Sequence, residues 1–98
     1  MSGPAYLVVD MKWRDEAQHS KVVELFLATL AKFGGKILSG SDRLEIIMGQ
    51  WKPRTLEIFE FPSATAFRSW YGSQESAPLL AIIREFAGTN VAFIDGSD

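Results

Sequence analysis

The chain has 98 residues, of which 47% are hydrophobic and 22% are charged, and its formal net charge at pH 7 is −2. This length suits one domain over residues 1–98, and the interspersed charges argue against a nucleic-acid partner and against binding to a membrane surface. Cysteine is absent and histidine occurs once, so disulfides and thiol catalysis are excluded and no metal site is expected. The N-terminal stretch lacks the pattern of a signal peptide and no apolar run is long enough for a membrane span, so a soluble cytoplasmic protein is expected.

The chain begins with a predicted strand and a long predicted helix. The β-branched and aromatic run at 5–13 predicts the strand, and residues 14–35 predict a helix that Asp15 caps and Gly34 ends. Residues at helical spacing form the apolar stripe of this helix: Val22, Val23, Phe26, Leu30 and Phe33. His19 continues the stripe at its wetter, N-terminal end.

The middle of the chain is rich in strand-forming residues. Segments 36–40 and 43–49 are strand-like and are separated by a turn-rich stretch, so they predict either one bent strand or a small hairpin. Residues 50–54 predict a turn, because Pro53 cannot donate a hydrogen bond to a strand ladder. Residues 55–61 predict the next strand.

The last third of the chain predicts a broken helix and a final strand. Ser63 is expected to cap a short helix that ends at Gly72. Pro78 suits the first turn of a further helix over 77–87, and residues 90–95 predict the last strand. The apolar stripe of the further helix consists of Leu79, Ile82, Ile83 and Phe86.

This order, β-α-β-β-α-β, predicts an α+β ferredoxin-like sandwich with helices on one face of the sheet and the first and third strands as antiparallel neighbours. Both alternating sets of residues in those two strands are apolar, so a second copy of the chain is expected to cover the other face in a homodimer. We expect Leu56 and Ile58 to face the helices, and Phe59 and Phe61 to face the partner. On this assignment, Phe59→Asp would break the dimer.

The most specific stretches of the sequence are "AYLVVDMKWRD", "LAKFGGKIL", "LEIFEFPSATAFRSWYGSQESAPL" and "VAFIDG". Together they resemble the bacterial domain-of-unknown-function family thirteen-thirty over nearly the whole chain. That family belongs to the dimeric α/β-barrel superfamily, which includes cofactor-independent monooxygenases, muconolactone isomerases and haem-binding enzymes. The resemblance implies a dimeric barrel of two facing sheets but no particular reaction. Similar members carry two tyrosines where this chain has His19 and Val22, so a different ligand is expected.

Two pairs of residues are candidates for a ligand site. Asp10 ends the first strand where the first helix begins, so it is placed to orient His19 for proton transfer. The alternative is that Asp10 bonds local backbone and His19 is a half-exposed surface residue. Trp70 and Tyr71 share a helix face with Phe67, and this face either packs on the sheet or keeps a polar tip in a cleft.

Glu57 and Glu60 lie on a predicted central strand, where carboxylates are unusual. Glu60 is expected to pair with Lys36, and Glu57 points to the opposite face, so the two carboxylates form no acid–base couple. The arginines are scattered and are expected to be solvated or paired charges rather than anion clamps: Arg43, Arg54, Arg68 and Arg84.

The sequence supports two functions of different classes. The first is a homodimeric small-molecule-binding or structural domain without a catalytic constellation and without a cofactor. The alternative, which the superfamily resemblance implies, is a cofactor-independent monooxygenase- or isomerase-like enzyme acting on a small aromatic substrate; haem binding through His19 is a third. The ligand is expected between the first helix, the broken second helix and the helix-facing side of the sheet, against His19, Asp10, Trp70 and Tyr71.

Overall fold

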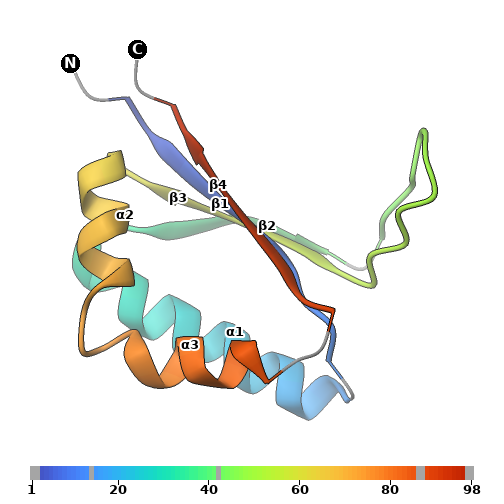
Figure 1. Cartoon of the computed structure of the whole chain (residues 1–98), viewed down its shortest axis with the longest axis horizontal. Helices are drawn as coiled ribbons and strands as arrows, with labels where there is room; N and C mark the ends of the chain where they lie inside the picture. The colour runs from blue at the N-terminus through green and yellow to red at the C-terminus, as the bar shows by residue number, and fades with distance from the viewer. Residues whose placement is uncertain (1–2, 14, 42, 86–87, 97–98) are drawn as a thin grey trace.

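Figure 1 shows a computed structural model of the chain, which describes residues 3–13, 15–41, 43–85 and 88–96. Its strands and helices follow the predicted order. They are β1 (Ala5–Asp10), α1 (Glu16–Leu30), a 3-10 turn (Ala31–Phe33), β2 (Lys36–Ser41), β3 (Leu56–Phe61), α2 (Ala64–Tyr71), α3 (Ala77–Arg84) and β4 (Asn90–Asp95).

The strands form one antiparallel sheet in the order β2-β3-β1-β4, and the helices lie together on one side of it (Figure 1). The predicted pairing of the first and third strands is confirmed, with Leu7 opposite Phe59 and Val9 opposite Glu57. The chain therefore has the ferredoxin-like α+β fold that its sequence predicts. No helix among the described residues is long and apolar enough to cross a membrane.

The predicted capping residues are found at the helix termini. The Asp15 carboxylate accepts a hydrogen bond from the backbone N–H of Gln18 at 2.8 Å, and the Ser63 hydroxyl accepts one from the N–H of Ala66 at 3.0 Å. Gly34 ends the first helical segment with φ of 76°, in the left-handed region that favours glycine. The predicted stripe of α3 is buried at Leu79 and Ile83, whereas Phe86 lies outside the described residues.

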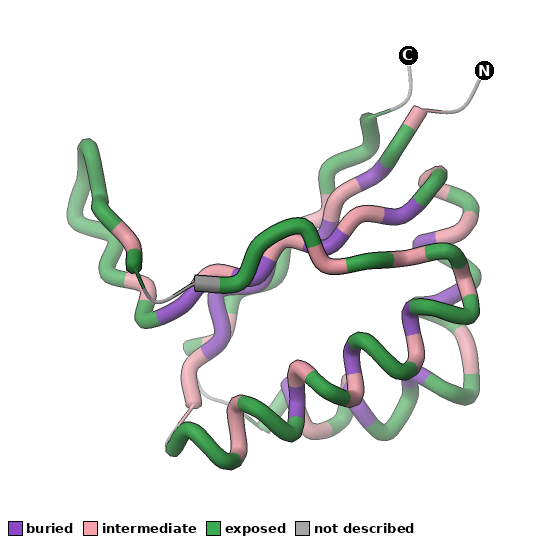
Figure 2. The backbone as a smooth tube through the Cα atoms, turned by 180° about the vertical axis from the view of Figure 1, so that it is seen from behind, coloured by how far each residue is buried: buried purple, intermediate pink, exposed green. Residues whose placement is uncertain are grey.

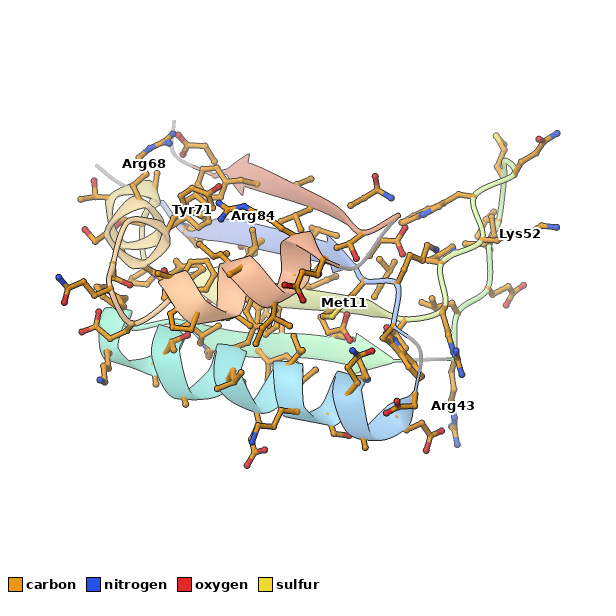
Figure 3. All side chains as sticks on the ribbon, turned by 60° about the horizontal axis from the view of Figure 1, so that its bottom comes forward. Met11, Arg43, Lys52, Arg68, Tyr71 and Arg84 are labelled. Carbon is orange, nitrogen blue, oxygen red and sulfur yellow. The ribbon has the colours of Figure 1, made fainter. Side chains whose placement is uncertain are left out.

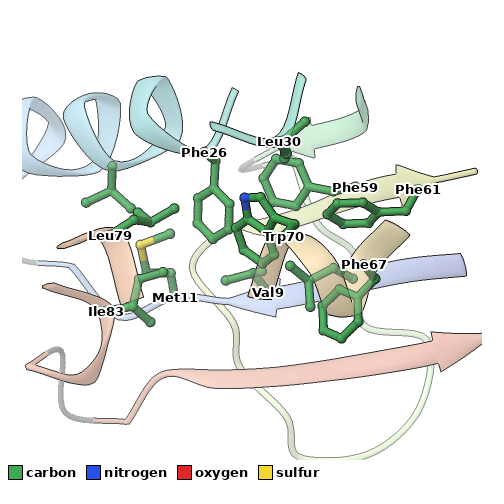
Figure 4. Packing of buried hydrophobic residues seen from close by; sticks show 12 residues of the cluster. Val9, Met11, Phe26, Leu30, Phe59, Phe61, Phe67, Trp70, Leu79 and Ile83 are labelled. Carbon is green, nitrogen blue, oxygen red and sulfur yellow. The ribbon is translucent and has the colours of Figure 1, made fainter. Parts of the chain in front are cut away.

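The core fills the space between the sheet and the helices, and Trp70 lies at its centre (Figure 4). The Trp70 indole is fully buried and packs near the rings of Phe26, Phe61 and Phe67, with ring centroids 5.5 to 6.1 Å apart. Its Nε1 donates a hydrogen bond to the Thr29 hydroxyl at 3.0 Å, so the polar tip of the indole is satisfied inside the protein.

The predicted assignment of the two sheet faces is wrong. Phe59 is fully buried and stacks on Phe26 of α1 at 4.6 Å, so the Glu57, Phe59 and Phe61 set faces the helices. Ile58 belongs to the alternate set and lies half-buried on the face away from the helices. Each set is apolar apart from one glutamate, so the pattern of β3 alone does not choose a face; in the structure Phe61 packs against the rings of Phe67 and Trp70. Phe59→Asp is therefore expected to unfold the protein rather than to split a dimer.

The predicted strand at 43–49 is also wrong, because residues 43–55 form a loop after β2. The loop rises on the side of the sheet away from the helices (Figure 1), and most of it is exposed (Figure 2). Ile47 and Met48 are 82% and 89% exposed. Strand propensity reflects packing against neighbouring strands, and none of the described strands pairs with this segment.

Candidate functional site

The most unusual contact in the protein joins α1 to the sheet beneath it. Glu57 is 1% exposed in the middle of β3, and the side chain of His19 on the first turns of α1 is 19% exposed. The imidazole Nε2 of His19 is hydrogen-bonded to Oε1 of Glu57. Since the carboxylate accepts the bond from Nε2, Nδ1 is the ring nitrogen left for another partner.

The His19 imidazole is also fixed in orientation by an aromatic stack. It stacks on the Trp13 indole, with ring centroids 4.7 Å apart and planes at 16°. The guanidinium of Arg54 lies over the Trp13 ring at 3.8 Å, and Trp13 Nε1 donates to the buried hydroxyl of Thr55 at 3.3 Å. The imidazole is therefore held by Trp13 on one ring face and by Glu57 at one edge.

A hollow of about 330 Å³ opens beside this stack, between the start of α1, the end of β2 and the loop. We call it the His19 hollow; its lining includes Trp13, His19, Ser20, Gly40, Arg43 and Thr55. Glu16 also lines it, so the lining combines a flat aromatic surface with hydroxyl groups, a guanidinium, an imidazole and a carboxylate. This is the mixture with which proteins orient small polar aromatic molecules.

Glu57 carries an unsatisfied polar atom. Among the described residues, its buried Oε2 has no hydrogen-bond partner. A buried acceptor without a partner costs about 1–3 kcal/mol, so such groups call for an explanation. Glu57 therefore keeps one carboxylate oxygen for the imidazole and one without a described partner inside the protein.

Asp10 does not orient His19, so that part of the predicted site is wrong. Its buried Oδ2 accepts a hydrogen bond from Trp51 Nε1 at 2.8 Å, and its Oδ1 lies 3.4 Å from Lys12 Nζ. Asp10 thus holds the base of the loop against β1. The strand register explains why His19 meets Glu57 and not Asp10. Val9 is the residue of β1 opposite Glu57, and Asp10 is one residue further along the strand. The carboxylate beneath α1 is therefore that of Glu57.

Trp70 and Tyr71 lie in a different place from His19. A second hollow of about 360 Å³ lies between α2, α3 and the β1–β4 edge of the sheet, and both residues line it. Trp70 is fully buried there, whereas Tyr71 is 50% exposed. We call it the Tyr71 hollow; it shares no lining residue with the His19 hollow. The predicted ligand residues therefore divide between two sites.

The residues around His19 do not fit a haem. Its Nε2 is held by Glu57, so axial ligation through that nitrogen requires this hydrogen bond to break. Among the described residues, the structure contains no cluster of three or more histidine, cysteine, aspartate or glutamate side chains that could hold a metal ion.

The fold and the site define a small ferredoxin-like domain with a polar hollow at one end. The profile of the family described as "Domain of unknown function (DUF1330)" matches residues 4–97, and the chain belongs to this family. The resemblance read from the sequence motifs is confirmed. No curated protein matches the sequence.

Solved structures with the same fold share little sequence with the chain. A protein of unknown function from Rhodopseudomonas palustris is 11% identical with a TM-score of 0.74, and the match covers 97% of this chain and 83% of that one. A dimeric ferredoxin-like protein of unknown function from Thermobifida fusca is 12% identical with a TM-score of 0.63, covering 97% and 92%. A protein from Caulobacter crescentus, provisionally named an antibiotic biosynthesis monooxygenase, is 15% identical with a TM-score of 0.58, covering 99% and 92%. At these identities the likeness shows the fold alone.

Proposed function

We propose that this protein is a homodimeric small-molecule-binding protein and that its ligand occupies the His19 hollow. The observation that carries the proposal is the imidazole of His19, held by the buried Glu57 and stacked on Trp13 at the edge of an open hollow. A fixed imidazole of this kind presents one nitrogen to a ligand at little entropic cost. A planar phenol, quinone or aromatic acid matches the indole surface and the polar groups around it.

The homodimer rests on the face of the sheet that the helices leave open. Tyr6, Val8 and Ile58 are half-buried on this face, and Ile94 is 52% exposed beside them. Loop 43–55 rises on the same side (Figure 1), so a second copy seated on the sheet meets the exposed apolar residues of the loop as well. The solved relative from Thermobifida fusca is dimeric, which supports this arrangement.

A cofactor-independent monooxygenase- or isomerase-like enzyme is the second candidate, and the His19–Glu57 pair favours it. Nδ1 of His19 has no hydrogen-bond partner among the described residues, so it is available to take a proton from an acidic O–H or C–H group of the ligand. The imidazolium then formed lies against the buried carboxylate, which stabilises it. Loss of such a proton begins both cofactor-independent oxygenation and isomerisation, and two solved structures of this fold bear provisional monooxygenase names.

One experiment tests both candidates. The wild type, His19→Gln and Lys21→Ala are screened by thermal shift against phenols, quinones and aromatic acids. Glutamine still donates a hydrogen bond to Glu57, so the buried carboxylate stays paired in His19→Gln, and Lys21→Ala is the matched control on the exposed side of α1. We expect at least one compound to stabilise the wild type and the control, and to stabilise His19→Gln much less.

Compounds that bind are then incubated with the protein in D₂O, and oxygen uptake is recorded in parallel. An enzyme accelerates hydrogen–deuterium exchange or oxygen uptake by roughly 10²-fold or more over His19→Gln, because His19 is the general base and general bases contribute about that much. Binding without either reaction favours the binding protein over the enzyme. If no compound stabilises the wild type, or if His19→Gln responds like the wild type to every compound that does, the His19 hollow is not the ligand site.

A further inference from the structure

The Tyr71 hollow has the composition of a site for an amphiphilic anion. Its floor is apolar and aromatic, with Phe67 of α2 stacked face to face on Phe93 of β4 at a centroid distance of 4.0 Å. The volume of about 360 Å³ falls within the range of small-molecule sites, about 300–1,000 Å³. The sheet face proposed for dimer contact is the opposite one, so a second copy leaves this hollow open.

Two arginine side chains lie at the edge of this apolar floor. Arg68 comes from the last turn of α2 and Arg84 from the last turn of α3, and both line the hollow. Figure 3 shows them on the same side as Tyr71, whose half-exposed phenol also lines the hollow. The guanidinium of Arg68 lies 5.5 Å above the Phe93 ring, which orients it over the floor.

Neither guanidinium forms an ion pair with a described residue. Within the part of the chain that the structure describes, no carboxylate lies within ion-pair distance of Arg68 or Arg84. Two unpaired arginines beside an apolar floor favour a ligand with one acidic end and an apolar body. The planar guanidinium fork matches a carboxylate, and the aromatic floor takes the rest of the molecule.

We propose that the Tyr71 hollow binds small monocarboxylic acids with an aromatic or aliphatic body, the carboxylate on Arg68 and Arg84 and the body against Phe67 and Phe93. The sequence gives no hint of this site, because the two arginines are far apart along the chain and belong to different helices. The hairpin of α2 and α3 brings them together. The site is separate from the His19 hollow, and either one can bind ligand without the other.

The test compares phenylacetate with phenylacetamide, which keeps the ring but has no charge. Both are titrated at millimolar concentration into the ¹⁵N-labelled full chain, and backbone amide shifts are followed. We expect phenylacetate to shift the signals of Arg68, Tyr71 and Phe93, and the double variant Arg68→Gln/Arg84→Gln to bind it at least about tenfold more weakly. The double variant Lys21→Gln/Lys32→Gln removes the same charge from exposed positions elsewhere and should bind like the wild type.

A second variant, Val91→Trp, fills the hollow from an exposed position on β4 and should prevent binding while leaving both arginines in place. Equal affinity for the acid and the amide would overturn the proposal, as would undiminished binding by either hollow variant. Shifts at Ser20 and Thr55 instead of Tyr71 and Phe93 would assign the acid to the His19 hollow and also overturn it. The absence of any shift would do the same.

Discussion

Trp70→Ala is expected to lower the free energy of unfolding by about 3–5 kcal/mol, the cost of removing a large buried aromatic residue. The indole is fully buried and packs near the rings of Phe26, Phe61 and Phe67, so alanine leaves a void that α2 cannot close without separating from the sheet. The variant also leaves the Thr29 hydroxyl without its donor from Nε1. A domain of this size has about 5–15 kcal/mol of stability, so the variant retains little of it.

The neighbouring residue supplies the control. Tyr71→Ala removes an aromatic side chain that is 50% exposed, and it should cost about 1 kcal/mol or less. Urea unfolding of both variants at one fixed protein concentration measures the difference, because dimer dissociation makes stability depend on concentration. Equal losses in the two variants would show that Trp70 is not at the centre of the core.

Ile58→Asp is expected to convert the proposed homodimer into folded monomers. Ile58 lies opposite Val8 on the open face of the sheet, so in a lone chain the new carboxylate meets water and the core is untouched. In the dimer the same carboxylate is buried against the partner, which costs several kcal/mol per subunit. The molar mass in solution should therefore fall from twice 10.9 kDa to 10.9 kDa.

Light scattering at micromolar concentration measures this change, and circular dichroism shows that the variant is folded. Thr65→Asp adds the same charge to the exposed surface of α2 and should leave the dimer intact. A wild type of 10.9 kDa would refute the homodimer itself. An intact dimer in Ile58→Asp would show that the subunits meet through another surface.

Local signals in the sequence predict most of the helices and strands and the order in which the strands pair. Asp15 and Ser63 cap helices because their side-chain oxygens reach backbone N–H groups a few residues later, and that spacing is visible in the sequence. Gly34 ends α1 and its 3-10 extension for an equally local reason. Once the elements are in place, the β-α-β-β-α-β order leaves few topologies, and the predicted neighbours β1 and β3 follow.

Local signals do not show which face of a strand meets the helices, nor which side chains from distant parts of the chain contact one another. In β3 both alternating sets are apolar apart from one glutamate each, so the sequence pattern does not decide whether Phe59 or Ile58 faces the helices. The contact between His19 and Glu57 depends on where α1 crosses β3, a property of packing rather than of sequence spacing. Glu57 itself carried a signal, because a carboxylate between Leu56 and Ile58 inside a predicted strand is unusual.

The most direct measurement of the central claim is an NMR spectrum of the His19 ring. Because the chain has one histidine, ¹⁵N-histidine labelling of the tag-free protein gives ring signals from His19 alone. The account predicts a protonated Nε2 bonded to Glu57, an Nδ1 that shifts when a ligand fills the His19 hollow, and a changed Nε2 signal in Glu57→Gln. Ring signals like those of free histidine, unaffected by Glu57→Gln and by every ligand that stabilises the protein, would contradict it.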